Sequence, residues 1–215
     1  MNANNGMERH ETAQIILWEA NELFYNKGYE KTSMREIAER VGISKAAMYH
    51  HFENKEEILY TLCTLGGEMM DESMERAISR NEGSGASIRV QLTDILYDYT
   101  TTYLQHNKNF NKILLHDIES LPEEKKRVIK GYQKVNVHRL LNYLQRMMDR
   151  GDMRTCELTP LTFTVFASVH WLYFWYDPEG SLSLRSVVEN IVDVFWNGLK
   201  PVNSSSSSGN ARSLP

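Results

Sequence analysis

The fold of this chain is decided by residues 32–55, which read TSMREIAERVGISKAAMYHHFENK. Ser33 is followed three residues later by Glu36, which is the capping-box pattern of a helix start. Gly42 interrupts this first short helix, and Ser44 offers a side-chain oxygen that can cap a second one. Two short capped helices joined by a turn with a central glycine predict a helix-turn-helix.

Outward from this motif, the chain keeps a helical pattern in both directions. Residues 8–27 place apolar side chains at three- and four-residue spacing, and Gly28 stands where a helix usually ends. Residues 1–7 are polar and lack periodicity, so we expect a loose tail there. A long helix should begin at Lys55, and Gly66-Gly67 inside it predicts either a kink or a close neighbour.

The remaining chain also predicts helices, and none of it has a convincing strand pattern. Helices are expected over residues 86–105, 110–119, 122–150, 159–176 and 183–199. Thr159-Pro160 has the residue types of a helix cap and a first helical position. The predicted class is therefore all-α with about nine helices. A helix-turn-helix head is expected over residues 8–54, a larger body over 55–200 and a disordered tail over 201–215.

Composition and charge limit the possible functions. Hydrophobic residues make up 41% and charged residues 24% of the chain, which is typical of a soluble globular protein. The sequence has no apolar run near the roughly 20 residues of a membrane span and no apolar segment of a secretory signal. The two cysteines, Cys63 and Cys156, fit a reducing compartment, so we expect a cytoplasmic protein without a membrane partner.

The net charge does not indicate nucleic-acid binding. It is −4 for the whole chain, and residues 1–60 contain seven Lys and Arg against ten Asp and Glu. Any prediction of DNA binding therefore depends on local geometry rather than on an overall basic character.

Motifs of catalysis and of cofactor binding do not occur in the sequence. It contains no G-x-S-x-G, no Walker loop, no G-x-G-x-x-G after a strand and no H-E-x-x-H. His116, Asp117 and Glu119 are metal-binding residue types, but on a helix His116 and Glu119 supply only two ligands. We therefore expect no enzyme activity, no cofactor and no metal.

The second short helix has two faces with different chemistry. The apolar seam that holds the small bundle together should contain Ile37, Ile43, Met48 and Phe52. This leaves the open side of the second helix to Lys45, Ala46, Ala47, Tyr49 and His50. A helix of this size fits the major groove of DNA, with its N-terminal residues at the base edges. Lys45 can donate to guanine O6 and N7, and the two alanines allow close approach and contact with a thymine methyl group. We therefore predict that this is a recognition helix.

Residues 15–59 resemble the DNA-binding head of the TetR family of bacterial transcriptional regulators. The resemblance rests on ANELF and GY within residues 20–29, TS and REIA within 32–38, VGIS at 41–44 and MYHHFENK at 48–55. It implies that Tyr49, His51 and Lys55 bind DNA phosphates, and that Ser33, Arg35 and Ser44 also lie on the DNA-binding surface. It further implies a regulator, commonly a repressor, that binds a palindromic double-stranded operator as a dimer.

The last two predicted helices are more apolar than a helix with one packing partner needs to be. Residues 161–176 are apolar almost all round, and residues 183–199 have an unusually wide apolar stripe. By resemblance to TetR proteins, these helices pair with the same helices of a second subunit, so that each subunit of the homodimer binds half of the operator. The alternative is an unusually large core in a monomer.

Several methionine and aromatic side chains should lie around the interior of the body, which predicts a site for a small hydrophobic effector. The candidates are Met70, Met74, Tyr103, His116, Met147, Trp171, Phe174 and Trp175. Plain core packing is the alternative for each of them.

One segment narrows the class of effector. Residues 170–183, HWLYFWYDPEGSLS, are similar to a segment of the TetR branch that controls fatty-acid and steroid-ring catabolism, whose members sense acyl-CoA thioesters. His170 replaces an asparagine of that pattern, and Arg139, Arg146 and Arg150 are candidates for binding the phosphates of coenzyme A. The resemblance implies a repressor that an acyl-CoA releases from its operator.

Two alternative functions stay open. The first is a repressor of a drug-efflux or stress operon that senses aromatic or cationic hydrophobic compounds. The second is a TetR-fold DNA-binding protein that is controlled by a protein partner.

Overall fold

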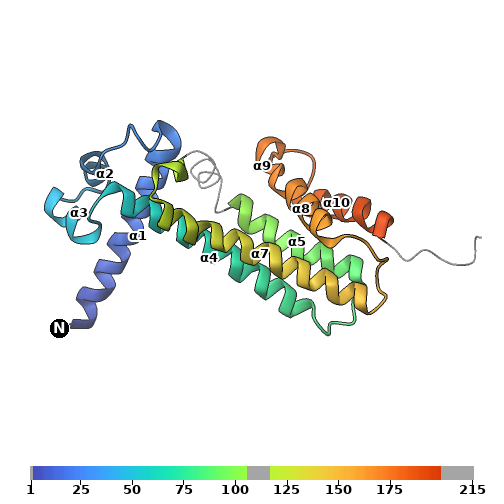
Figure 1. The fold of residues 1–215 in the computed structure, drawn as a ribbon. Coiled ribbons are helices and arrows are strands. Elements are labelled where there is room, and N and C mark those ends of the chain that lie inside the picture. Colours follow the sequence, from blue (N-terminus) through green and yellow to red (C-terminus); the bar gives the residue numbers. More distant parts are fainter. Residues whose placement is uncertain (1, 106–116, 200–215) are drawn as a thin grey trace, which may run out of the picture.

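A computed structural model describes residues 2–105 and 117–199, which are helical apart from short connections. The helices are α1 (Asn2–Lys27), α2 (Met34–Val41), α3 (Lys45–His51), α4 (Lys55–Asn81), α5 (Ile88–Gln105), η2 (Ile118–Ser120), α7 (Glu123–Asp149), α8 (Leu158–His170), α9 (Leu172–Trp175) and α10 (Leu184–Leu199). No strand occurs among the described residues, so the predicted all-α class is confirmed. Figure 1 shows α1 to α3 as a head at one end, with α4 running from this head along the body.

The helix caps of the head form as the sequence predicts. The hydroxyl oxygen of Ser33 accepts a hydrogen bond of 3.2 Å from the backbone N–H of Glu36 and so caps α2. Gly42 follows α2 with a φ of 79°, a left-handed conformation that glycine adopts without steric cost. The hydroxyl oxygen of Ser44 caps α3 by accepting a hydrogen bond of 3.1 Å from the N–H of Ala47. The helix-turn-helix is therefore present in the backbone.

The start of the chain differs from the prediction. α1 begins at Asn2, so residues 2–7 are helical and the expected loose tail is wrong for them. The physical reason is that extending an existing helix by one residue costs little, even where that residue is polar.

The region predicted as a single helix over residues 159–176 is divided in two. α8 begins at Leu158, one residue before the expected cap Thr159, and its first residue is buried in the core. α8 ends at His170, and the four-residue helix α9 follows after Trp171. No glycine or proline marks this break, so local sequence patterns do not predict it.

Two other predicted segments fall largely or wholly outside the described residues. The helix expected over residues 110–119 is described only at its end, where η2 begins at Ile118. The tail predicted over residues 201–215 lies outside the described residues altogether.

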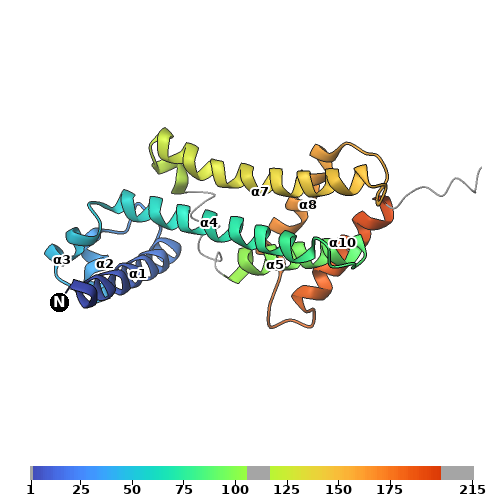
Figure 2. The ribbon, with the colours of Figure 1, turned by 90° about the horizontal axis from the view of Figure 1, so that it is seen from below.

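Helices α4 and α7 lie side by side and form the spine of the molecule (Figure 2). α4 is continuous through its two glycines, so the close-neighbour interpretation applies rather than the kink. A Cβ atom on Gly67 would lie 2.7 Å from Cγ of Tyr132, which is closer than real side chains approach. The hydroxyl of Tyr132 then donates a hydrogen bond of 3.0 Å to the carboxylate of Glu68. Gly67 thus permits the aromatic ring of α7 to rest on α4.

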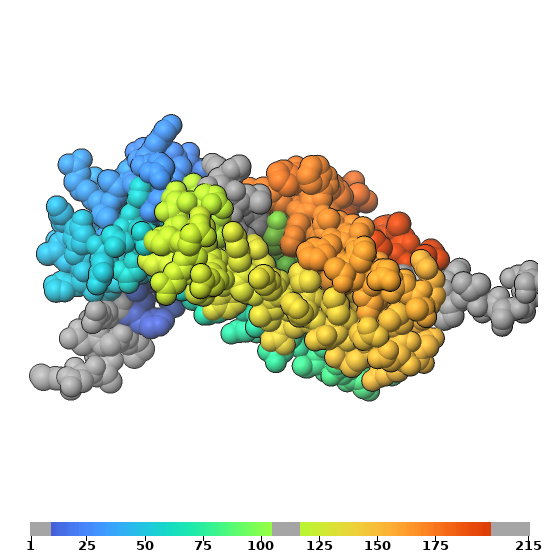
Figure 3. Space-filling model, viewed as in Figure 1, coloured from blue at the N-terminus to red at the C-terminus, as the bar shows by residue number. Residues whose placement is uncertain are grey.

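The apolar core of the head extends beyond the predicted head residues. It contains residues of α1, α2 and α3, and also Ile58, Leu59 and Cys63 from the first turns of α4. Ile118, Leu121 and Ile129, which precede or begin α7, belong to the same buried cluster. Figure 3 shows the first turns of α7 lying against the head. Movement of this end of the body is therefore coupled to the head by packing.

A second apolar core fills the body. It is formed by buried side chains of α4, α5, α7, α8 and α10, among them Met74, Ile95, Leu140, Val169 and Val188. Within the described ranges, no helix is long and apolar enough to cross a membrane.

Candidate DNA-binding surface and effector-binding body

The inner face of the predicted recognition helix α3 packs against the apolar core of the head. Ile37, Met48 and Phe52 are buried, and Ile43 packs partly buried against the same cluster. The predicted apolar seam is therefore confirmed. Because α2 and α3 are only eight and seven residues long, this seam and the two serine caps fix their orientation more than intrinsic helix propensity does.

The outer face of α3 is open. Lys45, Ala46, Tyr49 and His50 are exposed, and Ala47 is half-buried. The ammonium of Lys45 lies 5.9 Å from the centroid of the Tyr49 ring, one helical turn further on. Within the described part of the chain Lys45 forms no ion pair, so its charge is available to a ligand outside the protein. The side chains predicted to contact bases thus share one accessible surface.

Two further predicted positions flank this surface. Ser33 and Arg35 are exposed at the start of α2, and the guanidinium of Arg35 lies 3.3 Å from the carboxylate of Glu39. An exposed ion pair of this kind contributes little energy and exchanges readily for another anion. The DNA contacts of both residues stay predictions.

Lys55 and His51 have surroundings that the sequence did not reveal. The ammonium of Lys55 donates a hydrogen bond of 2.6 Å to the carbonyl oxygen of Tyr29 and lies 4.1 Å from the centroid of that ring. It also lies 3.4 Å from the carbonyl oxygen of Glu30. Lys55 therefore joins α4 to the loop after α1, and a phosphate would have to compete with these contacts. His51 is half-buried at the end of α3.

Two other basic residues of the head, Lys27 and Arg40, are paired with carboxylates. Lys27 contacts Glu36 at 2.5 Å, and Arg40 contacts Glu19 at 2.5 Å. These pairs join α1 to α2, and charge counting could not predict them because the partners are far apart in the sequence. The charges of Lys27 and Arg40 are therefore less available to DNA than that of Lys45.

The predicted effector residues do not form a single site in this chain. Met70, Met74 and Met147 are buried in the body core, and Tyr103 is half-buried beside it. Three large rings of the α8–α9 region are exposed instead, namely Trp171 (62%), Phe174 (61%) and Trp175 (50%). His116 lies outside the described residues. The aromatic residues were expected in the interior because they are apolar, but α9 turns them outward.

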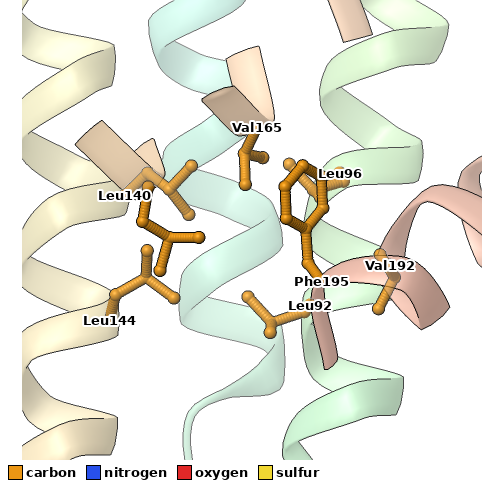
Figure 4. Close-up of a pocket in the computed structure, with 8 residues that line it drawn as sticks. Leu92, Leu96, Leu140, Leu144, Val165, Val192 and Phe195 are labelled. Carbon is orange, nitrogen blue, oxygen red and sulfur yellow. The ribbon is translucent and has the colours of Figure 1, made fainter. Parts of the chain in front are cut away.

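A small apolar cavity lies among α5, α7, α8 and α10 (Figure 4). Its volume is about 20 Å³, and its lining consists of Leu92, Leu96, Leu140, Leu144, Leu161, Val165, Val192 and Phe195. A space of this size holds about one water molecule, so this cavity as it stands is too small for an acyl chain. These aliphatic residues were missed because the sequence marks them only as ordinary core positions.

Two of the three arginines suggested for coenzyme A, Arg139 and Arg146, pair with acidic residues of α4 and of its C-cap. Arg139 donates hydrogen bonds of 2.6 and 3.2 Å to the two carboxylate oxygens of Asp71 and lies 3.2 Å from Glu75. Arg146 forms an ion pair with Glu82. Both arginines line an open groove of about 180 Å³ between α4 and α7. In this arrangement they connect the two helices of the spine.

A polar pair lies within the aromatic end of the body. The hydroxyl of Tyr99 on α5 and Nε2 of His170 on α8 are 3.0 Å apart. The His170 ring stacks on Tyr103 with centroids 4.6 Å apart, and its centroid lies 5.7 Å from that of Phe166. Burial lowers the pKa of His170 from 6.5 to about 4, so its imidazole is neutral near pH 7.

The outer sides of α8 and α10 expose apolar residues. Phe163 is 56% exposed and Val194 is 74% exposed, and both lie on helices whose opposite sides pack into the body core. Exposed large apolar side chains grouped on neighbouring helices are typical of a surface that another protein covers.

A helix-turn-helix head joined to a larger all-helical body defines a DNA-binding transcriptional regulator. The chain belongs to the TetR family. The family described as "Bacterial regulatory proteins, tetR family" matches residues 16–61, and "Tetracyclin repressor-like, C-terminal domain" matches residues 85–199. It is thus a ligand-responsive regulator of the family whose members bind DNA operators.

Three similar proteins show the range of regulation in this family. The chain is 22% identical to the transcriptional activator FasR of Mycolicibacterium smegmatis (strain ATCC 700084 / mc(2)155), covering 92% of this chain and 87% of FasR. It is also 22% identical to the transcriptional repressor KstR2 of Rhodococcus jostii (strain RHA1), covering 82% and 85%. The crystal structure of AibR in complex with isovaleryl coenzyme A and operator DNA has a TM-score of 0.70 at 27% identity, covering 85% and 97%.

Proposed function

We propose that this protein is a homodimeric repressor that binds a palindromic operator and is released from it by an acyl-CoA. The observation that carries the DNA-binding part is the open outer face of α3, where Lys45, Ala46 and Tyr49 are exposed together while Met48 holds the helix from inside. A helix presented in this way reads base edges in the major groove.

The homodimer is supported by the exposed apolar sides of α8 and α10. Lys27 and Arg40 are paired with carboxylates, and residues 1–60 contain more acidic than basic residues, so a single subunit would bind DNA weakly. A two-fold pair of heads doubles the contacts and matches a palindromic operator. Burial of Phe163 and Val194 against a second copy would supply apolar contact area.

The effector is proposed to enter the apolar body among α5, α7, α8 and α10. The cavity there has a volume of about 20 Å³, so a ligand with an acyl chain must select a more open arrangement of these helices. α7 belongs both to this lining, through Leu140, and to the head cluster, through Ile129. A shift of α7 would therefore change the position of the head. The AibR complex with isovaleryl coenzyme A supports the choice of ligand class.

The proposal is tested by selecting a binding site from random duplex DNA and measuring its release by fluorescence anisotropy. Butyryl-, octanoyl- and palmitoyl-CoA are titrated against free coenzyme A and a cationic dye. We expect release by at least one acyl-CoA and none by free coenzyme A. Release by the dye alone would support the efflux alternative, and the absence of any selected DNA site would refute the regulator itself.

The direction of regulation needs its own measurement, because FasR is named an activator and KstR2 a repressor. A reporter placed behind the selected operator should give more transcript when the protein is absent. Loss of transcript in its absence would show activation instead.

A further inference from the structure

One face of α5 connects the apolar cavity with the polar pair at the other end of the body. Leu92, Leu96, Tyr99 and Tyr103 follow the spacing of a single helical stripe. Leu92 and Leu96 line the cavity, as Figure 4 shows, whereas Tyr99 contacts His170. The stripe thus changes along its length from aliphatic to aromatic and hydrogen-bonding.

The length of this stripe suits the short acyl chain of an effector. At a rise of 1.5 Å per residue, Leu96 and Tyr103 are separated by about 10 Å along α5. Phe166 lies between the two ends: its ring packs on Tyr99 with centroids 5.2 Å apart, and it follows directly after the cavity residue Val165. A change in the position of the Phe166 ring would join the cavity to the polar pair.

The Tyr99–His170 pair has a defined hydrogen-bonding character. The neutral imidazole and the phenol together carry one N–H and one O–H, and their mutual hydrogen bond uses one of these. In either tautomer one donor remains, and the pair bears no net charge. Such a pair matches a neutral acceptor such as a carbonyl oxygen. It does not match an ammonium group, and it offers no cation to balance a carboxylate.

We propose that the Tyr99–His170 pair binds the carbonyl group of the effector, with the apolar chain lying along α5 toward Leu92. This inference rests on the proposed effector site and deepens it, because it names the residues that recognise the polar end and the chemical class they accept. That class is a neutral acyl derivative such as a thioester, rather than a free fatty acid or a cationic amphiphile. His170 is a binding residue in this arrangement, and Tyr103 supports its ring by stacking.

The test compares ligands with the same eight-carbon chain on the full-length protein. The probes are octanoyl-CoA, the octanoyl thioester of N-acetylcysteamine, octanoate and octylamine, and binding is followed by tryptophan fluorescence. The variants are Tyr99→Phe, His170→Phe and the double variant, which leaves no unpaired polar group behind. Tyr97→Phe is the matched control, because Tyr97 lies on another side of α5, where its ring is 5.4 Å from the guanidinium of Arg185.

We expect both thioesters to bind the wild-type protein more tightly than octanoate or octylamine. The double variant should bind them about tenfold more weakly, which corresponds to about 1.4 kcal/mol, and Tyr97→Phe should bind as the wild type does. Thermal unfolding of each variant establishes that it is folded.

The outcomes separate this inference from the proposed function. Unchanged thioester binding by the folded double variant would overturn the inference while leaving acyl-CoA as the effector. Binding of the N-acetylcysteamine thioester but not of octanoyl-CoA, with loss in the double variant, would support the carbonyl site and overturn the acyl-CoA proposal. Tighter binding of octanoate or octylamine would overturn both. No binding of any probe would overturn the inference alone, because butyryl- and palmitoyl-CoA still test the proposed function.

Discussion

The ammonium of Lys55 lies 2.6 Å from the carbonyl oxygen of Tyr29 and 4.1 Å from the centroid of its ring. This contact joins the first residue of α4 to the loop that follows α1. It stabilises the attachment of the head to the long helix of the body, because a charged hydrogen bond and a cation–π contact act at the same point.

The two lysines of the predicted DNA-binding surface, Lys45 and Lys55, should therefore behave differently on substitution. Lys55→Ala should lower the free energy of unfolding by about 1–2 kcal/mol, because it removes the contacts with Tyr29. Lys45→Ala should leave stability almost unchanged and relax base preference at one operator position by roughly 1–3 kcal/mol. Urea unfolding and binding-site selection measure the two effects, with Lys134→Ala as an exposed control on α7. If Lys55→Ala is as stable as the wild type, the contacts with Tyr29 do not stabilise the head, and binding of a DNA phosphate stays the predicted role of Lys55.

The close contact of α4 with α7 predicts opposite effects of the same substitution at two glycines. Gly67→Ala should destabilise the protein by about 1–3 kcal/mol, because its Cβ would lie 2.7 Å from Cγ of Tyr132. Gly131→Ala should stabilise it by about 0.5–1 kcal/mol, because no atom lies within 4 Å of its Cβ position and alanine is the better helix former. Chemical denaturation of both variants is the measurement. Equal effects of the two substitutions would contradict the close packing of α4 on α7.

The proposed homodimer is tested by introducing a charge at an exposed and at a buried valine of the same helix, α10. Val194→Glu should give a folded monomer, because Val194 is 74% exposed in the single chain and would meet a second copy. Val188→Glu should instead unfold the protein, because Val188 is fully buried in its own body core. Light scattering and circular dichroism separate these results, and Val135→Glu on α7 is the exposed control. A wild-type protein that is monomeric at micromolar concentration would remove the proposed dimer.

His170 predicts a pH dependence of stability. Its pKa is lowered by burial from 6.5 to about 4, so the unfolded chain binds a proton more readily than the folded protein does. The stability contributed by the neutral imidazole is present above pH 6.5 and is lost as the pH falls toward 4, with a total on the order of 3 kcal/mol.

This pH dependence is measured as the free energy of unfolding between pH 4 and pH 7. His170→Phe should flatten this profile, because the buried titrating group is removed from beside Tyr99, Tyr103 and Phe166. His138→Gln, which removes a histidine from an exposed position of α7, is the matched control variant. Identical slopes in wild type and His170→Phe would show that His170 is hydrated in the folded protein.

The local structure of the head can be predicted from short-range patterns in the sequence. The caps Ser33 and Ser44, the turn at Gly42 and the apolar seam around Met48 were all readable, because caps, turns and helix faces depend on residues close together in the chain. The same is true of the open face of α3, since the seam fixes which side chains point outward.

The tertiary structure was needed to identify contacts between residues that are distant in the sequence. It paired Lys55 with the Tyr29 carbonyl, placed Tyr132 over Gly67 and brought Tyr99 to His170. It also placed the Trp171 side chain at the surface, although the apolar character of the surrounding segment suggested an interior position. Periodicity gives the face on which a side chain lies but not the helix that covers that face. Which contacts form depends on how the helices cross, and this is set by packing of the whole chain.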